Sequence, residues 1–262
     1  MMANYRPFAN DFLRRVAFAL GLRKQARRLR DGLLASLGCP QAYVELATLA
    51  REVRDVTYID IGCHHGATVQ RFLDLAGAVP VVAFDPSAAN LEIARRAVRS
   101  HNAVTFIRAA VSDEDGSNTF FSNANEQTSS LLPNAAGNLR SFPQDTRTIT
   151  TTEVDVVRLD TWAAAQMPHG HAIVKCDTQG AEAKVIRGGL RFLREQAVAF
   201  YGEVMLDGMY EGQPSFQELR DLLEGNCGLV LRNIYPCLHD REGRAVQFDA
   251  LWVRPDILSA LR

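Results

Sequence analysis

Acidic side chains lie at or near the ends of several short apolar runs of the chain. Asp60 falls in YIDI, Asp85 closes VVAFD, Asp177 closes IVKCD, and Glu203 lies near the end of AVAFYGEVM. Runs of this kind predict buried β-strands, and ligands bind at the carboxyl ends of the strands in open α/β sheets. A carboxylate placed there can accept a hydroxyl proton, balance a cation or act as a general base.

Two glycines and two adjacent histidines follow the first of these runs, in the segment YIDIGCHHGA at residues 58–67. Glycines at a strand-to-helix turn let the backbone approach a ligand, and amides at the start of the helix are free to bind it. The spacing differs from the G-x-G-x-x-G of a dinucleotide site, and an acid before the first glycine would repel phosphate but attract the ammonium of S-adenosylmethionine (SAM). The residues that we expect to bind the cofactor in this segment are Asp60, Gly62, Cys63, His64 and Gly66.

Asp85 lies 25 residues after Asp60, at the end of the second predicted strand. A carboxylate at this distance typically accepts both hydroxyl protons of a ribose, so we assign Asp85 and the adjacent Pro86 to the cofactor site. The alternative is that Asp85 only caps the helix that follows. Small side chains at the next corner, Ala110 among them, leave room for an adenine ring.

His64 and His65 are expected neither in a dinucleotide-binding loop nor in a SAM-binding turn. Adjacent side chains diverge in most backbone conformations and no third ligand lies nearby in the sequence, so we predict no metal site here. We expect His64 to line the cofactor pocket and His65 to face the acceptor. The alternative is that both rings are solvated.

From residue 56 onward, short apolar runs alternate with helical patterns, which predicts a parallel sheet with crossover helices. The predicted parallel strands are 56–61, 80–85, 104–111, 171–177 and 197–205. Two further runs, 229–236 and 247–255, predict a terminal antiparallel hairpin. This arrangement fits the three-layer, seven-stranded α/β sandwich of class I methyltransferases better than an all-parallel dinucleotide sheet.

Helices are predicted from apolar residues at i, i+3, i+4 and i+7. One such set is Val69, Phe72, Leu73 and Ala76, and a second is Ile186, Gly189, Leu190 and Leu193. A third helix begins at Ser215, where Glu218 would complete a capping box before the apolar face of Leu219, Leu222 and Leu223.

The segment between the third and fourth parallel strands predicts a turn at Gly116 that leads into a strand, followed by a long polar loop. Loops of that length in compact domains are usually lids or binding loops. We therefore expect residues 117–152 to form a lid over the active site. Its Asn, Gln and Ser residues, from Asn123 to Ser130, favour a polar acceptor.

The composition excludes some partners. The 262 residues include 29 Lys and Arg against 30 Asp and Glu, so the net charge of −1 gives no reason to expect nucleic acid. Five dispersed cysteines without a C-x-x-C pair indicate reduced thiols, and no apolar run is long enough to span a bilayer. We expect a cytoplasmic protein, and the sequence does not predict its oligomeric state.

The first 50 residues differ from the rest, because eight Arg and Lys face two Asp in positions 1–31. We interpret residues 1–50 as a basic helical extension and residues 51–262 as the main domain. An apolar stripe in the extension permits peripheral membrane contact or partner docking, and the alternative is a helical cap on the core.

The stretch VKCDTQGAEAKVIRGG, residues 174–189, resembles the motif of the FkbM-type methyltransferase family. The residues that match are Lys175, Asp177, Gln179, Gly180, Ala181, Glu182, Arg187 and Gly188. Similar matches occur in YIDIGCHHGA, AAVSDEDG, VVRLDTW, GEVMLDGMYEGQPSF and FDALWVRP, so the resemblance covers about residues 55–254. His64 and His65 depart from it, because the family commonly has Asn and then a small or apolar residue there.

The resemblance implies a SAM-dependent methyltransferase, most often acting on a hydroxyl of a sugar, a glycan or a polyketide-like natural product. We expect Asp177, Glu182 and Glu203 to supply the general base, with Asp177 also near the cofactor. The residues expected to contact the acceptor are His65, Ser129, Ser130, Gln179 and Tyr210. Three such acids could instead chelate Mg²⁺. The alternatives to this function are an NAD-linked oxidoreductase and a non-catalytic SAM-binding partner protein.

Overall fold

The computed structural model describes residues 41–99, 103–141, 144–167, 169–206, 208–239 and 242–260. The chain divides into two units, Met1–Glu45 and Leu46–Arg262. The first 40 residues of the predicted basic extension lie outside the described residues. Helix α3 (Gln41–Glu52) runs across the boundary that the sequence predicted at residue 50.

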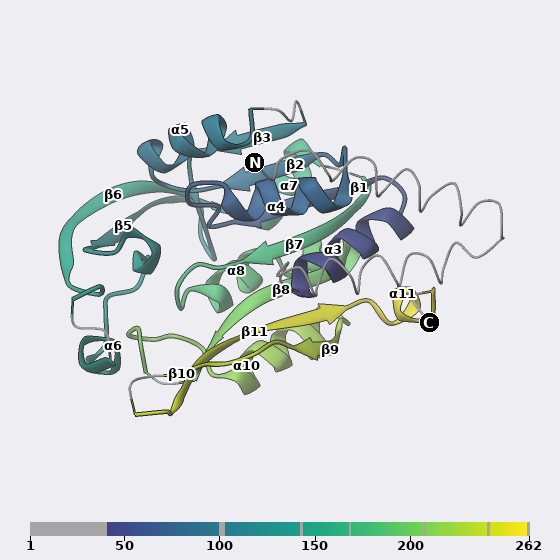
Figure 1. Cartoon of the computed structure of the whole chain (residues 1–262). Helices are drawn as coiled ribbons and strands as arrows, with labels where there is room; N and C mark the ends of the chain where they lie inside the picture. Colours follow the sequence, from purple (N-terminus) through teal and green to yellow (C-terminus); the bar gives the residue numbers. More distant parts are fainter. Residues whose placement is uncertain are drawn as a thin grey trace, which may run out of the picture. The chain divides into compact units, whose positions relative to one another are not determined.

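The main sheet has the strand order β10-β11-β8-β7-β1-β2-β3, with β9 paired to β11 (Figure 1). Its strands are β1 (Val56–Ile61), β2 (Val81–Phe84), β3 (Val104–Ile107), β7 (His171–Cys176), β8 (Ala197–Met205), β9 (Val230–Ile234), β10 (Leu238–His239) and β11 (Ala245–Val253). The pairs that join β3, β2, β1, β7 and β8 are parallel, and β11 is antiparallel to β8, β9 and β10. Five parallel strands and the antiparallel pair of β9 and β11 confirm the predicted class I methyltransferase architecture.

The parallel strands are continuous apolar runs because helices cover both of their faces. All nine residues of β8 are buried, as are five of the six in β1 and in β7. Tyr58 of β1 stacks on Phe72 with ring centroids 3.9 Å apart, and both side chains are fully buried. The order of the strands reverses at β1, so the switch point between β1 and β7 is where an open α/β sheet binds its ligand.

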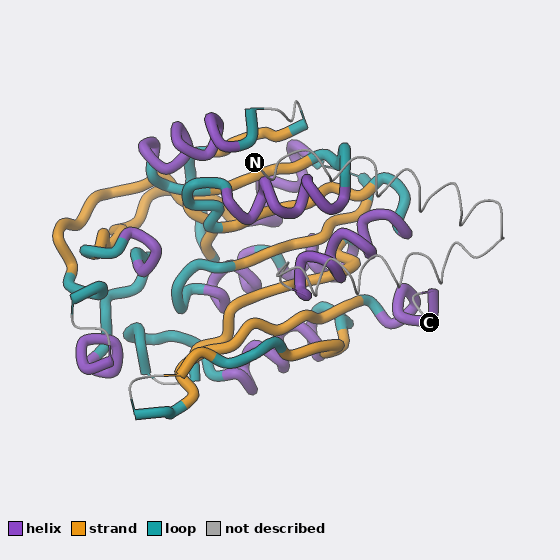
Figure 2. Tube along the Cα trace, viewed as in Figure 1, coloured by secondary structure: helices purple, strands orange, loops and turns teal. Residues whose placement is uncertain are grey.

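Helices lie around the strands of this sheet (Figure 2). They are α4 (Ala67–Ala76), α5 (Ala88–Ala97), α7 (Leu159–Gln166), α8 (Glu182–Gly188), α9 (Leu190–Glu195), α10 (Phe216–Arg220), a π-helical turn (Asp221–Asn226) and α11 (Pro255–Ala260). Helix α4 buries Val69, Phe72 and Leu73 as predicted. In the described part of the chain, no helix is both long and apolar enough to cross a bilayer.

Two local predictions about these helices need correction. The single helix predicted around residues 186–193 is broken at Gly189, which ends α8 and begins α9. Ser215 caps α10 by accepting a hydrogen bond from the Glu218 amide, as predicted. The Glu218 side chain pairs with Arg187 of α8, so an interhelical ion pair replaces the contact to the backbone expected of a capping box.

The segment between β3 and β7 forms a second sheet rather than a long polar loop. Strand β4 (Ala110–Ser112) pairs in parallel with β6 (Thr148–Arg158), and β5 (Gly116–Asn123) is antiparallel to β6. The predicted strand 104–111 is therefore two strands that belong to different sheets. The connection between β5 and β6 contains a 3-10 helix, η1 (Glu126–Thr128), and the short helix α6 (Ala136–Ser141). Figure 1 shows α6 near the strands of the second sheet.

Candidate active site

A cavity of about 540 Å³ lies at the carboxyl ends of β1, β2, β7 and β8, where the topology predicts a ligand site. This volume is within the usual range for a small-molecule site, about 300 to 1,000 Å³. Twelve of the predicted site residues line it: Gly62, Cys63, His64, His65, Asp85, Pro86, Ala110, Ser129, Asp177, Gln179, Glu203 and Tyr210. Four do not: Asp60, Gly66, Glu182 and Ser130.

The turn after β1 packs directly against the end of β7. Gly62 has φ of 81°, and a Cβ there would lie 2.0 Å from the backbone oxygen of Asp177, so only glycine fits. Gly66 has φ of 78°, and a Cβ there would meet Ala94 of α5 at 3.0 Å. Gly66 therefore brings α4 close to α5 and does not contact the cavity, which corrects its predicted role in binding the cofactor.

Asp60 is fully buried and does not line the cavity. Its carboxylate lies 3.0 Å from the Lys175 ammonium and accepts a hydrogen bond from the Thr68 hydroxyl at 2.6 Å. Burial raises the pKa of Asp60, and the nearby ammonium opposes that effect. Asp60 itself therefore presents no surface to the cavity, whereas its two partners, Lys175 and Thr68, both line it.

Asp85 lines the cavity at the end of β2, with three protein donors on its carboxylate. Oδ2 accepts the His64 amide at 2.9 Å, and Oδ1 accepts the Ser87 amide at 2.9 Å and the Asn90 side chain at 3.2 Å. A carboxylate offers about four acceptor positions, so one remains open, on Oδ2. Burial raises the pKa of Asp85. This geometry allows Asp85 to accept one further hydrogen bond from a hydroxyl. The sequence predicted that Asp85 accepts hydrogen bonds from both hydroxyls of a diol.

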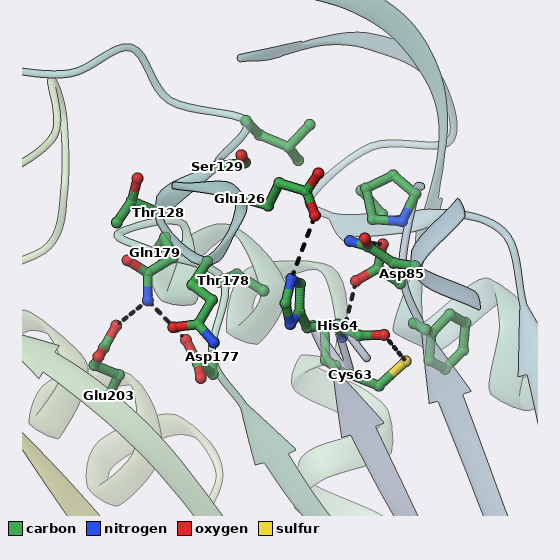
Figure 3. Close-up of a pocket in the computed structure, with 18 of the residues that line it drawn as sticks. Cys63, His64, Asp85, Glu126, Thr128, Ser129, Asp177, Thr178, Gln179 and Glu203 are labelled. Atoms are coloured by element: carbon green, nitrogen blue, oxygen red, sulfur yellow. Dashed lines mark hydrogen bonds and ion pairs between the residues drawn. The ribbon is translucent and has the colours of Figure 1, made fainter. Parts of the chain in front are cut away.

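Asp177 and Glu203 come together at the base of the cavity through one side chain (Figure 3). Gln179 Nε2 donates to Asp177 Oδ1 at 2.9 Å and to Glu203 Oε2 at 2.8 Å. The Tyr210 hydroxyl lies 3.0 Å from Gln179 Oε1, within donating distance, which fixes the orientation of the amide. The two acids come from different strands, β7 and β8, and are held in place as a pair.

The two acids differ in environment. Glu203 is 7% exposed, and its other oxygen accepts the Gln247 side-chain amide at 2.6 Å. Burial, with the negative charge of Asp177 as a smaller cause, raises the pKa of Glu203 well above its usual value. The Asp177 side chain is 40% exposed, and its Oδ2 lies 3.6 Å from the Lys175 ammonium. Asp177 is therefore the more accessible carboxylate, and Glu203 is the one that favours a proton.

Glu182 is buried and does not line the cavity, so the structure does not support its predicted catalytic role. Its buried carboxylate accepts the amide and the hydroxyl of Thr178, at 2.8 and 3.0 Å. Burial raises the pKa of Glu182 to about 7. Because Glu182 holds the turn that follows β7, Asp177, Glu182 and Glu203 do not converge on a common point as a Mg²⁺ site of three acids requires.

The η1 helix lines one side of the cavity, and the two serines that follow it differ in role. Ser129 lines the cavity and accepts the Asn123 amide at 3.1 Å. Ser130 is 1% exposed, and its hydroxyl lies 2.8 Å from the backbone oxygen of Gln179. Ser130 thus connects this segment to the turn after β7, where the sequence predicted a contact with substrate.

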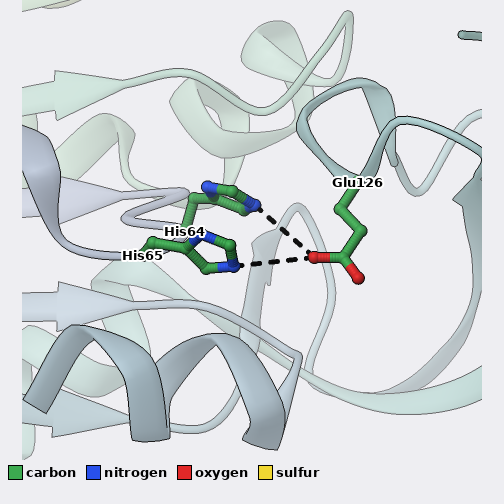
Figure 4. Close-up of side chains that lie close together, drawn as sticks. All are labelled: His64, His65 and Glu126. Carbon is green, nitrogen blue, oxygen red and sulfur yellow. Dashed lines mark ion pairs between the residues drawn. The ribbon is translucent and has the colours of Figure 1, made fainter. Parts of the chain in front are cut away.

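The side chains of His64 and His65 do not diverge. His64 has φ of 47°, and this left-handed backbone turn places the two rings in a stack with centroids 3.7 Å apart. Both Nε2 atoms face Glu126 of η1, at 3.8 Å from His64 and 3.6 Å from His65 (Figure 4). Burial, together with the neighbouring His65, lowers the pKa of His64. The predicted divergence of the side chains, on which the exclusion of a metal site rested, is wrong.

The family model for the methyltransferase FkbM domain matches residues 60–231. The chain belongs to this family. The match begins at Asp60 and ends within β9, so this FkbM methyltransferase domain contains every cavity-lining residue except Leu238 and Gln247.

Individual relatives of this FkbM family member were also found. The 2-O-methyltransferase NoeI of Sinorhizobium fredii (strain NBRC 101917 / NGR234) is 26% identical over 210 residues, which cover 78% of this chain and 85% of that protein. Among solved structures, Aeropyrum pernix fibrillarin with natively bound S-adenosyl-L-methionine has a TM-score of 0.44 at 12% identity, covering 77% of this chain and 67% of that one. The N-methyltransferase NodS from Bradyrhizobium japonicum WM9 has a TM-score of 0.44 at 10% identity, covering 82% and 95%.

Sequence reasoning assigned no site role to Lys175, Glu126 and Gln247, which all line the cavity. Lys175 could have been found, because it is a single charged residue within an apolar strand and pairs in register with Asp60. Glu126 and Gln247 carried no such signal. Their side chains reach the site through a loop and through an antiparallel strand, whose positions depend on the tertiary fold.

Proposed function

We propose that this FkbM family methyltransferase transfers the methyl group of SAM to a hydroxyl of a sugar, a glycan or a similar small natural product. The observation that carries the proposal is the pair of carboxylates, Asp177 and Glu203, held by one amide at the base of a cavity at the sheet's switch point. The name of the relative NoeI, a 2-O-methyltransferase, supports oxygen as the methyl acceptor.

The residues at one end of the cavity suit the cofactor. The open acceptor position of Asp85 fits one ribose hydroxyl, and Ala109 and Ala110 line the adjacent wall with small side chains that suit an adenine ring. Carboxylate charge on Asp177 favours a cation such as the ammonium of SAM. When bound, SAM supplies an activated methyl group on a sulfonium centre.

Asp177 is the residue that we assign as general base. Its carboxylate is exposed to the cavity, and the bond from Gln179 leaves acceptor positions free on both of its oxygens. Asp177 would accept the proton of the acceptor hydroxyl, while SAM, when bound, would supply the methyl group and leave as the neutral thioether S-adenosylhomocysteine. A positioned base of this kind contributes typically about 10²- to 10⁴-fold in rate.

Glu203 and Tyr210 are assigned to holding the acceptor. Glu203 is buried and favours the protonated form, so it can donate one hydrogen bond to a hydroxyl oxygen of the acceptor. The Tyr210 hydroxyl lies within donating distance of the backbone oxygen of Thr128, at 2.9 Å, and of Gln179, and can donate to one of them at a time. These groups provide polar contacts on the side of the cavity opposite Asp85, and polar contacts there favour an acceptor with several hydroxyls.

Calorimetric titration of the full chain with SAM and, separately, with NAD tests the proposal against its main alternative. We expect saturable heat with SAM and none with NAD. Heat with NAD alone would favour an oxidoreductase and contradict the proposal. SAM binding with no methyl transfer to any glycan or small-molecule fraction would favour a non-catalytic binding protein.

A further inference from the structure

Three potential metal ligands from two separate segments meet at the edge of the cavity. His64 and His65 lie in the turn after β1, and Glu126 lies in η1. Their nearest ligand atoms all lie within 4.8 Å of one another (Figure 4). Within the described residues, neither His64 Nε2 nor His65 Nε2 has a hydrogen-bond partner, although both atoms are shielded from solvent.

The distances in this cluster are too long for direct hydrogen bonds. A charge-assisted N–H···O bond measures about 2.7 to 2.9 Å, whereas Nε2 lies 3.8 and 3.6 Å from the Glu126 carboxylate. Ligands at about 2.0 to 2.2 Å from a tetrahedral ion are about 3.3 to 3.6 Å from one another. The two distances to Glu126 therefore match the separation of groups around an ion to within a few tenths of an ångström.

We propose that His64, His65 and Glu126 form a binding site for one divalent transition metal ion, such as Zn²⁺, Co²⁺ or Fe²⁺. Two imidazoles and one carboxylate are typical of such ions, while Mg²⁺ prefers oxygen ligands and water. Three protein ligands leave at least one coordination position open.

Capture of the ion requires a small adjustment of the rings. The two ring planes are inclined by 23°, and both Nε2 atoms face the same Glu126 oxygen, so their lone pairs lie side by side. The χ2 torsion of histidine has broad wells, which permits the rings to turn toward a common point. The Glu126 side chain is 66% exposed, so it can move toward an ion and solvent can deliver one.

The site would join two parts of the cavity wall. The His64 amide donates to Asp85, and η1 carries Thr128, whose backbone oxygen lies within reach of Tyr210. An ion held between them would fix η1 against the turn after β1. The open coordination position would be available to an oxygen of a small molecule in the cavity, because all three ligands line it.

The test uses the untagged full chain after metal removal with a chelator. Zn²⁺ is measured by equilibrium dialysis with elemental analysis, and Co²⁺ by its visible absorption bands. We expect one ion per chain, with no competition from excess Mg²⁺. The variants H65N and E126Q should weaken Zn²⁺ binding at least about tenfold, because each removes one of three ligands.

Matched controls are H169N and E114Q, which change exposed residues away from the cavity and should bind Zn²⁺ as the unmodified chain does. Circular dichroism confirms that each variant is folded. The absence of bound Zn²⁺ and Co²⁺ would overturn the proposal, as would binding that H65N and E126Q leave unchanged. Neither result bears on methyl transfer, because metal binding is measured without SAM or an acceptor.

Discussion

Asp177 and Glu203 accept hydrogen bonds from the same nitrogen atom, Gln179 Nε2, at 2.9 and 2.8 Å. The two acids end neighbouring parallel strands, and the glutamine belongs to the turn that follows the first of them. An amide donor suits this position because it satisfies both carboxylates without adding charge. One accessible acid therefore lies beside one buried acid that favours its protonated form, an arrangement that suits the proposed base and hydrogen-bond donor for one hydroxyl.

The Lys175–Asp60 ion pair should stabilise the domain only as an intact pair. K175M removes the cation from a fully buried carboxylate, which we expect to cost about 3 to 5 kcal/mol in the free energy of unfolding. The double variant D60N/K175M should recover most of that loss. Urea denaturation measures both. K184M, which breaks the more exposed pair with Asp113, should cost at most about 1 kcal/mol. Equal losses in K175M and K184M would contradict the account.

Gly62 should tolerate no side chain, because it combines a positive φ with close packing. Gly77 also has a positive φ, of 87°, but nothing lies within 4 Å of an added Cβ. G77A should therefore report backbone strain alone, about 1 to 3 kcal/mol. G62A should lower the free energy of unfolding by about 3 kcal/mol more than G77A does, because its Cβ would lie 2.0 Å from the Asp177 oxygen. Similar unfolding free energies for the two variants would show that the contact is unimportant.

Glu182 should make the stability of the domain depend on pH. Its pKa of about 7 in the folded protein exceeds its ordinary value of 4.5, so the stability from its protonated form is present below pH 4.5 and is lost as pH rises through 7. E182Q mimics the protonated form at every pH. Its free energy of unfolding should therefore rise relative to that of the unmodified chain as pH increases from 5 to 8, by about 3 kcal/mol. Urea denaturation at several pH values measures this, with E195Q, an exposed residue, as the control. Parallel pH curves for E182Q and the unmodified chain would refute it.

Asp85 should be required for SAM binding. D85N weakens the charged acceptor that faces the cavity, and we expect the dissociation constant for SAM to rise about 10- to 100-fold. Calorimetry measures the constant, and D74N, at an exposed position of α4, should leave it unchanged. If D85N bound SAM normally while remaining folded, Asp85 would be only a structural residue that holds the His64, Ser87 and Asn90 donors.

The sequence predicted the main sheet well, because strands buried on both faces are continuous apolar runs that local patterns reveal. β1, β7 and β8 follow their predicted ranges within one residue. The strand that follows Gly116, β5, was predicted, but its partner β6 was missed, because the polar composition of β6 resembles that of a loop. Only four of the eleven residues of β6 are apolar, and most of β6 is exposed.

Within the site, the predictions failed where a side chain's direction depended on backbone conformations that the sequence does not encode plainly. His64 adopts a positive φ although it is not glycine, which turns its ring onto His65. Glu182 was placed correctly at the start of α8, but its carboxylate satisfies the Thr178 amide instead of facing the cavity. Asp177 and Glu203 could be placed because the ends of adjacent parallel strands necessarily meet.

The most direct test of the central claim is mass spectrometry of glycan and small-molecule fractions incubated with the chain and SAM that carries a deuterated methyl group. The account predicts that the label appears on an acceptor oxygen, and that D177N transfers at least about 100-fold less at SAM concentrations that saturate the variant. Full transfer by D177N would contradict the assignment of the base. Label found only on nitrogen or carbon would contradict the proposed O-methylation.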